Sequence, residues 1–244
     1  QDNKLLRQAL NNLNVSNALN IVLQFAKAYV DIFIQSENMT KPLSQQDYFN
    51  VMQVFETIII RKRQFSNDIE MLIDILNYDA YGLSNVLFLK NNDIDYETKA
   101  FCANKAKECF EKDFELIKLF ENEFKNNDCL LSLLKSYIFN DIGHLYKDAF
   151  SDKKLFLENL TKSVENRKKL HQTFVSNYPK NIFLATKLEQ EYIIALSEQC
   201  NYMENSVIKT MQKNIVMAKF EEWEKELVYT SSLTDRIKDN IEKF

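Results

Sequence analysis

The chain has 244 residues, of which 45% are apolar and 27% are charged, and its net charge is -4. These values suit a globular protein with a sizeable core, and they exclude a chain that attracts nucleic acid or acidic membrane through its overall charge. No uninterrupted apolar run reaches the roughly 18 residues of a membrane-spanning helix, so we expect no membrane insertion.

The scarcity of turn-forming residues indicates the fold class. Only two glycines and two prolines occur in the whole chain. Sheets and α/β folds need these residues to reverse the chain, whereas helical hairpins can turn on Asn, Asp and Ser, which are abundant here. The composition therefore predicts an all-α protein.

Apolar residues recur at helical spacing along nearly the whole chain. In chain order, the clearest stripes lie within Val51–Ile59, Ile69–Leu76, Leu116–Phe124, Leu130–Ile138 and Leu233–Phe244. The polar clusters that separate helices are Ser36–Lys41, Asn77–Gly82, Asn91–Asp95, Lys125–Asp128, Phe150–Asp152, Asn177–Asn181, Gln199–Asn201 and Tyr229–Ser232. We predict a single domain, 1–244, of about nine antiparallel helices, two of them long: Ser44–Asn77 and Asp95–Asn126.

The sequence shows no catalytic or metal-binding constellation. His144 follows Asp141 at the spacing of half a di-iron site, but Lys168 stands where a second half-site before His171 needs a carboxylate. An isolated histidine on a helix is far more often a structural group than a ligand. No glycine-rich phosphate cradle, serine elbow or Cys–His pairing occurs. We expect no enzymatic activity, no catalytic residue, no cofactor and no metal.

The cysteines favour a reducing compartment. Cys102 and Cys109 lie two turns apart on one expected helix face, too far to bond to each other, and no CxxC spacing occurs. Nothing at the start of the sequence reads as a signal peptide. We therefore expect a cytoplasmic protein whose four thiols are reduced and mostly buried.

Two stretches resemble signature segments of the 14-3-3 protein family. The segment from Leu43 to Arg63, LSQQDYFNVMQVFETIIIRKR, is similar to the family's third helix: a Leu-Ser cap, an apolar face, an aromatic and then a pair of arginines. The chain end, LTDRIKDNIEKF, is similar to the family's ninth helix, with Asn240 and Phe244 at the family's spacing. Length, helix number and the Pro179-x-x-Ile182 entry to the seventh helix also fit.

This resemblance implies a cup-shaped dimeric adaptor that holds phosphoserine or phosphothreonine segments of other proteins in a concave groove. Residues 1–90 would provide the dimer interface and the first groove helix, and residues 91–244 would provide the remaining groove helices. Both a homodimer and a heterodimer with a related chain fit this expectation. The alternative is a tetratricopeptide-like scaffold that binds unphosphorylated partners, although the chain shows no fixed 34-residue repeat.

Only part of the family's phosphate pocket is matched. Arg63 corresponds to the central arginine of the third helix and Asn240 to the asparagine of the ninth. The departures are Glu56 for a lysine, Asn67 for an arginine, Asn140 and Asp141 for an Arg-Tyr pair, and Glu189 for an asparagine. No other register restores the Arg-Tyr pair, because residues 128–150 contain no arginine. The groove wall keeps Leu188, Tyr192, Leu233 and Phe244, whereas Arg236 and Lys243 replace apolar residues.

These departures predict weak phosphopeptide binding. Each charge-assisted hydrogen bond to phosphate contributes roughly 1.5–3 kcal/mol, and two or three cationic partners are missing. Two outcomes stay open. Other cations, such as Arg61, Lys62 or Arg236, could gather the phosphate at a relocated site, or the groove could take unphosphorylated or basic segments.

Overall fold

The computed structural model describes residues 67–123, 128–204, 206–226 and 237–244. Every regular element within these ranges is helical, which confirms the predicted all-α class. The helices are α4 (Asn67–Phe88), α5 (Tyr96–Glu123), α6 (Asp128–Asp148), α7 (Lys153–Asn177), α8 (Ile182–Tyr202) and α9 (Val207–Glu226), and residues 237–241 form one more helical turn. Among these helices, none combines the length and the apolar character needed to cross a bilayer.

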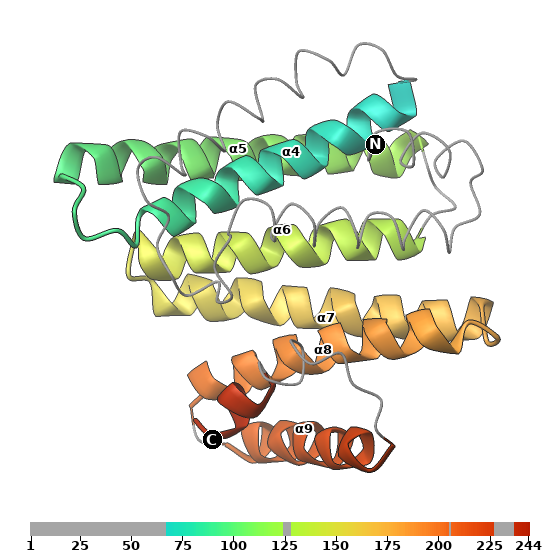
Figure 1. Cartoon of the computed structure of the whole chain (residues 1–244). Helices are drawn as coiled ribbons and strands as arrows, with labels where there is room; N and C mark the ends of the chain where they lie inside the picture. The colour runs from blue at the N-terminus through green and yellow to red at the C-terminus, as the bar shows by residue number, and fades with distance from the viewer. Residues whose placement is uncertain (1–66, 124–127, 205, 227–236) are drawn as a thin grey trace.

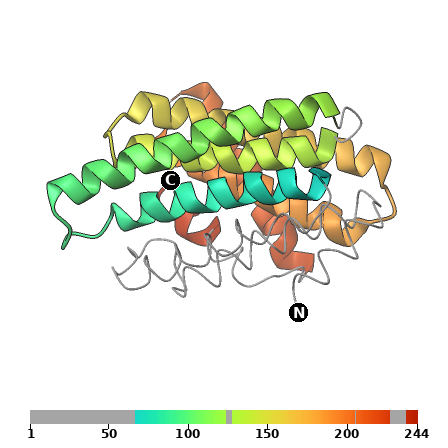
Figure 2. The ribbon, with the colours of Figure 1, turned by 90° about the horizontal axis from the view of Figure 1, so that it is seen from above.

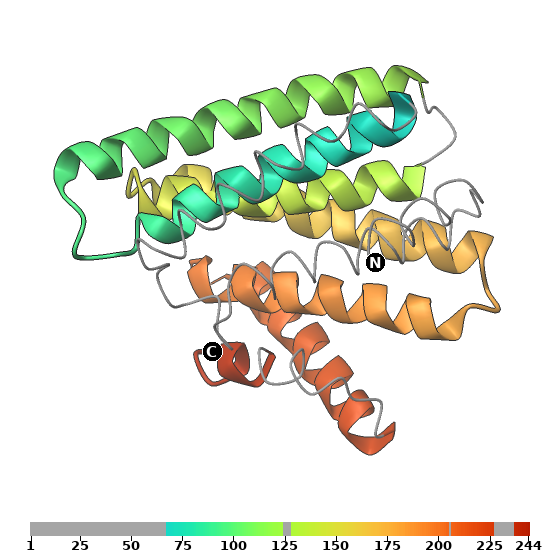
Figure 3. The same cartoon turned by 45° about the horizontal axis from the view of Figure 1, so that its top comes forward.

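The helices are stacked in the order of the sequence. Figure 1 shows α4 and α5 at one end of the stack, followed by α6, α7, α8 and finally α9, and consecutive helices from α4 to α8 run in opposite directions. Seen from above in Figure 2, α4 and α5 lie nearest the viewer, and the tilted view in Figure 3 places α9 and the C-terminus at the far end. Each helix thus packs mainly on its neighbours in the chain.

Polar residues mark several helix boundaries at the positions predicted from the sequence. Asp152 caps α7 by accepting a hydrogen bond from the backbone nitrogen of Leu155 at 2.9 Å, and Asn181 caps α8 by accepting one from Leu184 at 3.2 Å. Ser151, just before the first cap, has a φ of 53°. The predicted breaks at Asn91–Asp95, Phe150–Asp152 and Asn177–Asn181 are therefore confirmed.

One predicted break is wrong and another is displaced. The cluster Asn77–Gly82 lies inside α4, which continues to Phe88, so the chain has no break there. Gly82 remains helical because it is buried against α5: a Cβ atom added there would lie 2.6 Å from Cε1 of Phe110. The cluster Gln199–Asn201 lies inside the last turn of α8, where the buried Gln199 side chain donates to Thr161 of α7 at 2.7 Å.

The core has two parts. The larger cluster fills the space between α4, α5 and α6 and extends to α7 and α8, and the smaller one joins α7, α8 and α9 to the residues after 236. All four cysteines are buried and free, as predicted. The largest side chains with almost no exposure include Phe110, Phe156 and Phe174. Side chains from α6 contact three neighbouring helices, which makes α6 the centre of the larger part.

Candidate functional site

Several residues of the predicted pocket lie outside the part of the chain that the structure describes. These are Glu56, Arg63, Leu233 and Arg236, and the side chain of Asn67, the first residue of α4, belongs with them. The remaining predicted residues lie on α6, on α8 and in the last residues of the chain.

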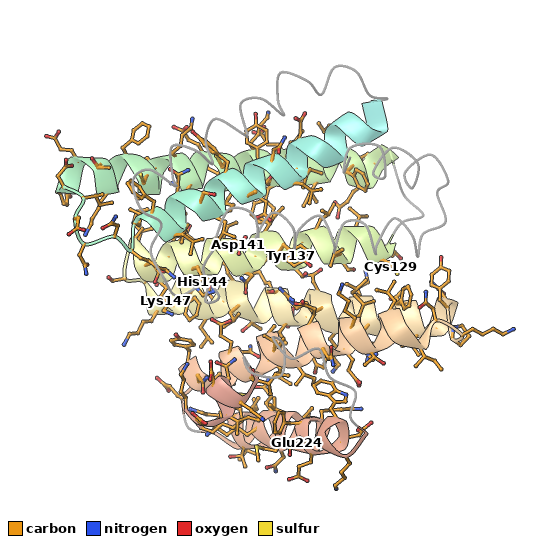
Figure 4. The ribbon with its side chains drawn as sticks, viewed as in Figure 1. Cys129, Tyr137, Asp141, His144, Lys147 and Glu224 are labelled. Atoms are coloured by element: carbon orange, nitrogen blue, oxygen red, sulfur yellow. The ribbon has the colours of Figure 1, made fainter. Side chains whose placement is uncertain are left out.

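Asn140 and Asp141, which stand where the resemblance expects an Arg-Tyr pair, lie in the second half of α6. Asp141 is only 7% exposed, and it accepts a hydrogen bond from the Asn140 amide at 3.0 Å. Its carboxyl group also interacts with that of Asp79 on α4, and the interaction raises the pKa of Asp79. Figure 4 shows Asp141 on α6 between Tyr137 and His144. Asp141 therefore belongs to the packed interior and not to an open groove wall.

The α8 residues divide between the two parts of the core. Leu188 is buried in the larger cluster, whereas Tyr192 packs against the smaller one. Glu189 forms an ion pair with Lys219 of α9, with 3.0 Å between Oε1 and Nζ. Each of these side chains contacts a neighbouring helix. These positions on α8 therefore contribute to helix packing, and not only to the predicted groove wall.

The last residues of the chain close over α8. Asn240 donates from Nδ2 to the Ser197 hydroxyl at 2.9 Å, and its Oδ1 accepts from Asn201 at 3.4 Å. Phe244 packs on the smaller cluster, and Lys213 donates to its carbonyl oxygen at 2.7 Å. The structure thus brings Tyr192 and Phe244 to the same cluster and ties Asn240 to α8, but it does not bring Asp141 to them.

A buried ion pair that the sequence analysis missed joins α7 to α8. Nη1 of Arg167 lies 2.6 Å from Oε2 of Glu191, and its guanidinium carbon lies 5.3 Å from the centre of the Tyr137 ring. Arg167 is only 8% exposed. In the sequence, Arg167 lies at helical spacing from the apolar residues Leu160, Val164, Leu170 and Phe174, and this pattern could have predicted that Arg167 is buried.

Three carboxyl groups from α4, α5 and α6 form a second polar group. They belong to Asp113 and Asp141, which are buried, and to Asp79, which is partly buried. Desolvation raises the pKa of Asp79 and of Asp113 well above the usual range; Asp141 raises that of Asp79 further, and Asp79 and Asp141 raise that of Asp113. Burial also raises the pKa of Asp141 to about 6, against the opposing effects of Asn140 and Arg167. Shifts of this kind mark candidate functional positions as well as structural ones.

His144 forms a further polar contact between α6 and α8. Its Nε2 lies 3.4 Å from Oε1 of Glu198, and its Nδ1 is buried without a hydrogen-bond partner. Burial lowers the pKa of His144, whereas Glu198 acts in the opposite direction. In the ranges described, no three His, Cys, Asp or Glu side chains are grouped so that they could hold a metal ion.

No family model, curated protein or solved structure matches this chain. A function is therefore inferred from the residues of the sequence and from their arrangement in the described helices. Two features carry information: the family-like stretches Leu43–Arg63 and Leu233–Phe244, and the contacts that occupy the predicted pocket positions on α6 and α8.

Proposed function

We propose that the chain is a cytoplasmic 14-3-3-like adaptor of about nine helices, not an enzyme, which binds protein segments in a concave groove with little dependence on phosphate. The family resemblance at both ends of the chain and the stack of antiparallel helices support the adaptor role. The observation that carries the weak phosphate dependence is the buried carboxyl group of Asp141 at a position where the resemblance expects a cation or tyrosine.

The charges near α6 oppose phosphate binding. Asp141 is neighboured by the carboxyl group of Glu198, which raises its pKa and disfavours a further negative charge there. Arg167, the cation that acts on Asp141, is held by Glu191. Losing two or three cationic contacts removes on the order of 4 kcal/mol or more. An ordinary micromolar complex, worth about -8 kcal/mol, would then approach the millimolar range.

A phosphoserine peptide library is expected to bind at least about tenfold more weakly than it binds an ordinary family member, and hardly better than the same library without phosphate. Fluorescence anisotropy with both libraries measures this difference. The double variant Glu56→Lys, Asn140→Arg should recover phosphate-dependent affinity, because it restores two cations without changing the buried Asp141. The exposed variant Asn104→Arg is the matched control for added charge.

Micromolar, phosphate-dependent binding by the unaltered protein, abolished by Arg63→Ala, would contradict the proposed loss of phosphate recognition. The alternative function is a tetratricopeptide-like scaffold for unphosphorylated partners. The packing of each described helix mainly on its chain neighbours favours it, because repeat scaffolds share that arrangement. On the scaffold hypothesis Arg63→Ala leaves peptide binding unchanged, whereas on the adaptor hypothesis the same variant weakens it.

The adaptor proposal includes a dimer built from the N-terminal helices. Leu5, Leu6, Ala9 and Leu10 form an apolar stripe that a short isolated helix cannot bury by itself, and they lie outside the described residues. Light scattering is expected to give twice the monomer mass of 28.9 kDa. The variant Leu6→Glu, Leu10→Glu should give the monomer mass. A monomer in the unaltered protein at micromolar concentrations would contradict the proposed interface.

A further inference from the structure

Each of three packed helices places one aspartate at a core position. Asp79 continues the stripe of Leu76, Leu83 and Val86 on α4, Asp113 continues that of Phe110, Ile117 and Phe120 on α5, and Asp141 continues that of Leu134, Ile138 and Leu145 on α6. Helical spacing turns each aspartate toward the same interior as its apolar neighbours. The three carboxyl groups therefore meet where α4, α5 and α6 pack together.

The hydrogen bonding of these groups requires protons. Asp113 is 0% exposed, and neither of its carboxyl oxygens has a hydrogen-bond partner. The carboxyl groups of Asp79 and Asp141 act on each other, and the pKa of each is raised. A hydrogen bond between them needs a proton on one of the two, because ionised carboxylates only accept. An ionised, unpaired carboxylate in the core loses its hydration without compensation, so Asp113 is expected to hold a proton.

Neighbouring groups do not replace these protons. Among the described residues, the titratable groups that act on the carboxyl groups are Cys109 from α5, Tyr137 from α6, Arg167 from α7 and Glu198 from α8, with Lys105 and Glu108 beside Cys109 and Glu191 beside Tyr137. Arg167 is bound to Glu191, and Lys105 to the exposed Glu108. The described residues form no metal-binding group there. Within the described residues, protons are thus the means of neutralising the three carboxyl groups.

We propose that Asp79, Asp113 and Asp141 form a proton-held junction between α4, α5 and α6 that loosens as the pH rises above neutral. Loss of the shared and buried protons leaves like charges inside the packed helices, and their repulsion favours separation of the helices, which lets water reach the charges. This inference does not depend on the adaptor function. It concerns α6, which carries Asn140 and Asp141, and the two helices packed on it. The packing of these helices would therefore change with pH.

The direction of the pH effect follows from the pKa shifts. The pKa of each of the three carboxyl groups is raised in the fold, so the junction is most stable at low pH and loses stability as the pH rises through the folded-state pKa values. The two histidines act oppositely, because burial lowers the pKa of His144 and His171 from 6.5. Their contribution rises with pH and is nearly complete about one pH unit above that value, so the histidines cannot cause a fall in stability. A fall between about pH 6.5 and about pH 8.5 that Asp113→Asn removes therefore belongs to the carboxyl groups, chiefly Asp79 and Asp113, because the pKa of Asp141 is already about 6.

Hydrogen exchange of the full chain tests the proposal. Protection of backbone amides in α4, α5 and α6, corrected for the intrinsic exchange rate at each pH, is expected to fall at least about tenfold between about pH 6.5 and about pH 8.5. Asp113→Asn, which keeps the shape and cannot ionise, should remove most of this fall. The matched control Glu115→Gln on the exposed face of α5 should leave it unchanged.

Equal protection at both pH values in the unaltered protein would overturn the proposal, as would a fall that persists unchanged in folded Asp113→Asn. Should that variant fail to fold, carbon-13 NMR titration of the aspartate carboxyl groups in the unaltered protein decides the question. At least one aspartate should titrate above about pH 6, and titration of all aspartates below about pH 5 would overturn the proposal.

Discussion

Replacing Arg167 with methionine is expected to lower the free energy of unfolding by about 3 kcal/mol, the lower end of the range for breaking a buried ion pair. Methionine retains much of the packing of the arginine stem but removes the guanidinium group. The variant leaves the Glu191 carboxylate without its partner at 2.6 Å and removes the cation over the Tyr137 ring. Glu191 keeps some access to water, which limits the loss.

Urea denaturation of the unaltered protein and the variant measures this change. The matched control is Lys154→Met, because Lys154 and Glu158 form an ion pair at 4.0 Å whose side chains are 85% and 48% exposed. An exposed pair contributes at most about 0.5 kcal/mol, so the control should hardly differ from the unaltered protein. Arg167→Met combined with Glu191→Leu should regain most of the stability. Equal, small losses in both single variants would show that the pair is not buried.

Replacing Gly82 with alanine is expected to destabilise the protein by about 2 kcal/mol, although alanine is the better helix former by about 1 kcal/mol. The added Cβ would lie 2.6 Å and 2.7 Å from two ring carbons of Phe110. Phe110 is almost fully buried in the larger core, so its ring cannot move aside without disturbing its neighbours. The steric cost therefore exceeds the gain in helix propensity.

The other glycine of the chain supplies the matched comparison. A Cβ atom at Gly143 of α6 would lie 3.4 Å from its nearest neighbours, on Phe156, which is an ordinary contact. Gly143→Ala is therefore expected to be neutral or to stabilise by up to about 1 kcal/mol. Thermal and urea unfolding of both variants give the comparison. A Gly82→Ala protein as stable as Gly143→Ala would show that α4 and α5 are not in close contact at that position.

The sequence was sufficient to predict the helical class and those boundaries that depend on local chemistry. Asp152 and Asn181 each cap the helix that follows by accepting a hydrogen bond from a backbone nitrogen three residues later. Because both partners are close in the chain, such a cap can be predicted from the sequence. The boundary predicted at Asn77–Gly82 failed because its outcome depends on Phe110, 28 residues beyond Gly82. Helix propensity could not reveal that a missing side chain allows two helices to approach each other.

The candidate site was less predictable, since its residues act through distant partners. Asp113 interrupts the stripe of Phe110 and Ile117, a pattern visible in the sequence, but the two carboxyl groups beside it come from other helices. Arg167 likewise finds Glu191 across a helix boundary. Asp141 was selected because it stands where the resemblance expects a tyrosine, and its burial beside Asp79 was not foreseen. The roles of Arg63 and Glu56 in the pocket remain predictions, because both residues precede the described part of the chain.

The stacking of the described helices in chain order has a consequence for how the protein is made. From α4 onward, the pairs with the most extensive packing are mainly neighbours in the sequence. Such contacts close short loops, which favours rapid folding. Each helix leaving the ribosome can therefore dock on the one made just before it, without waiting for the end of the chain. Growth of the stack from α4 toward α9 would then keep the apolar faces covered during synthesis.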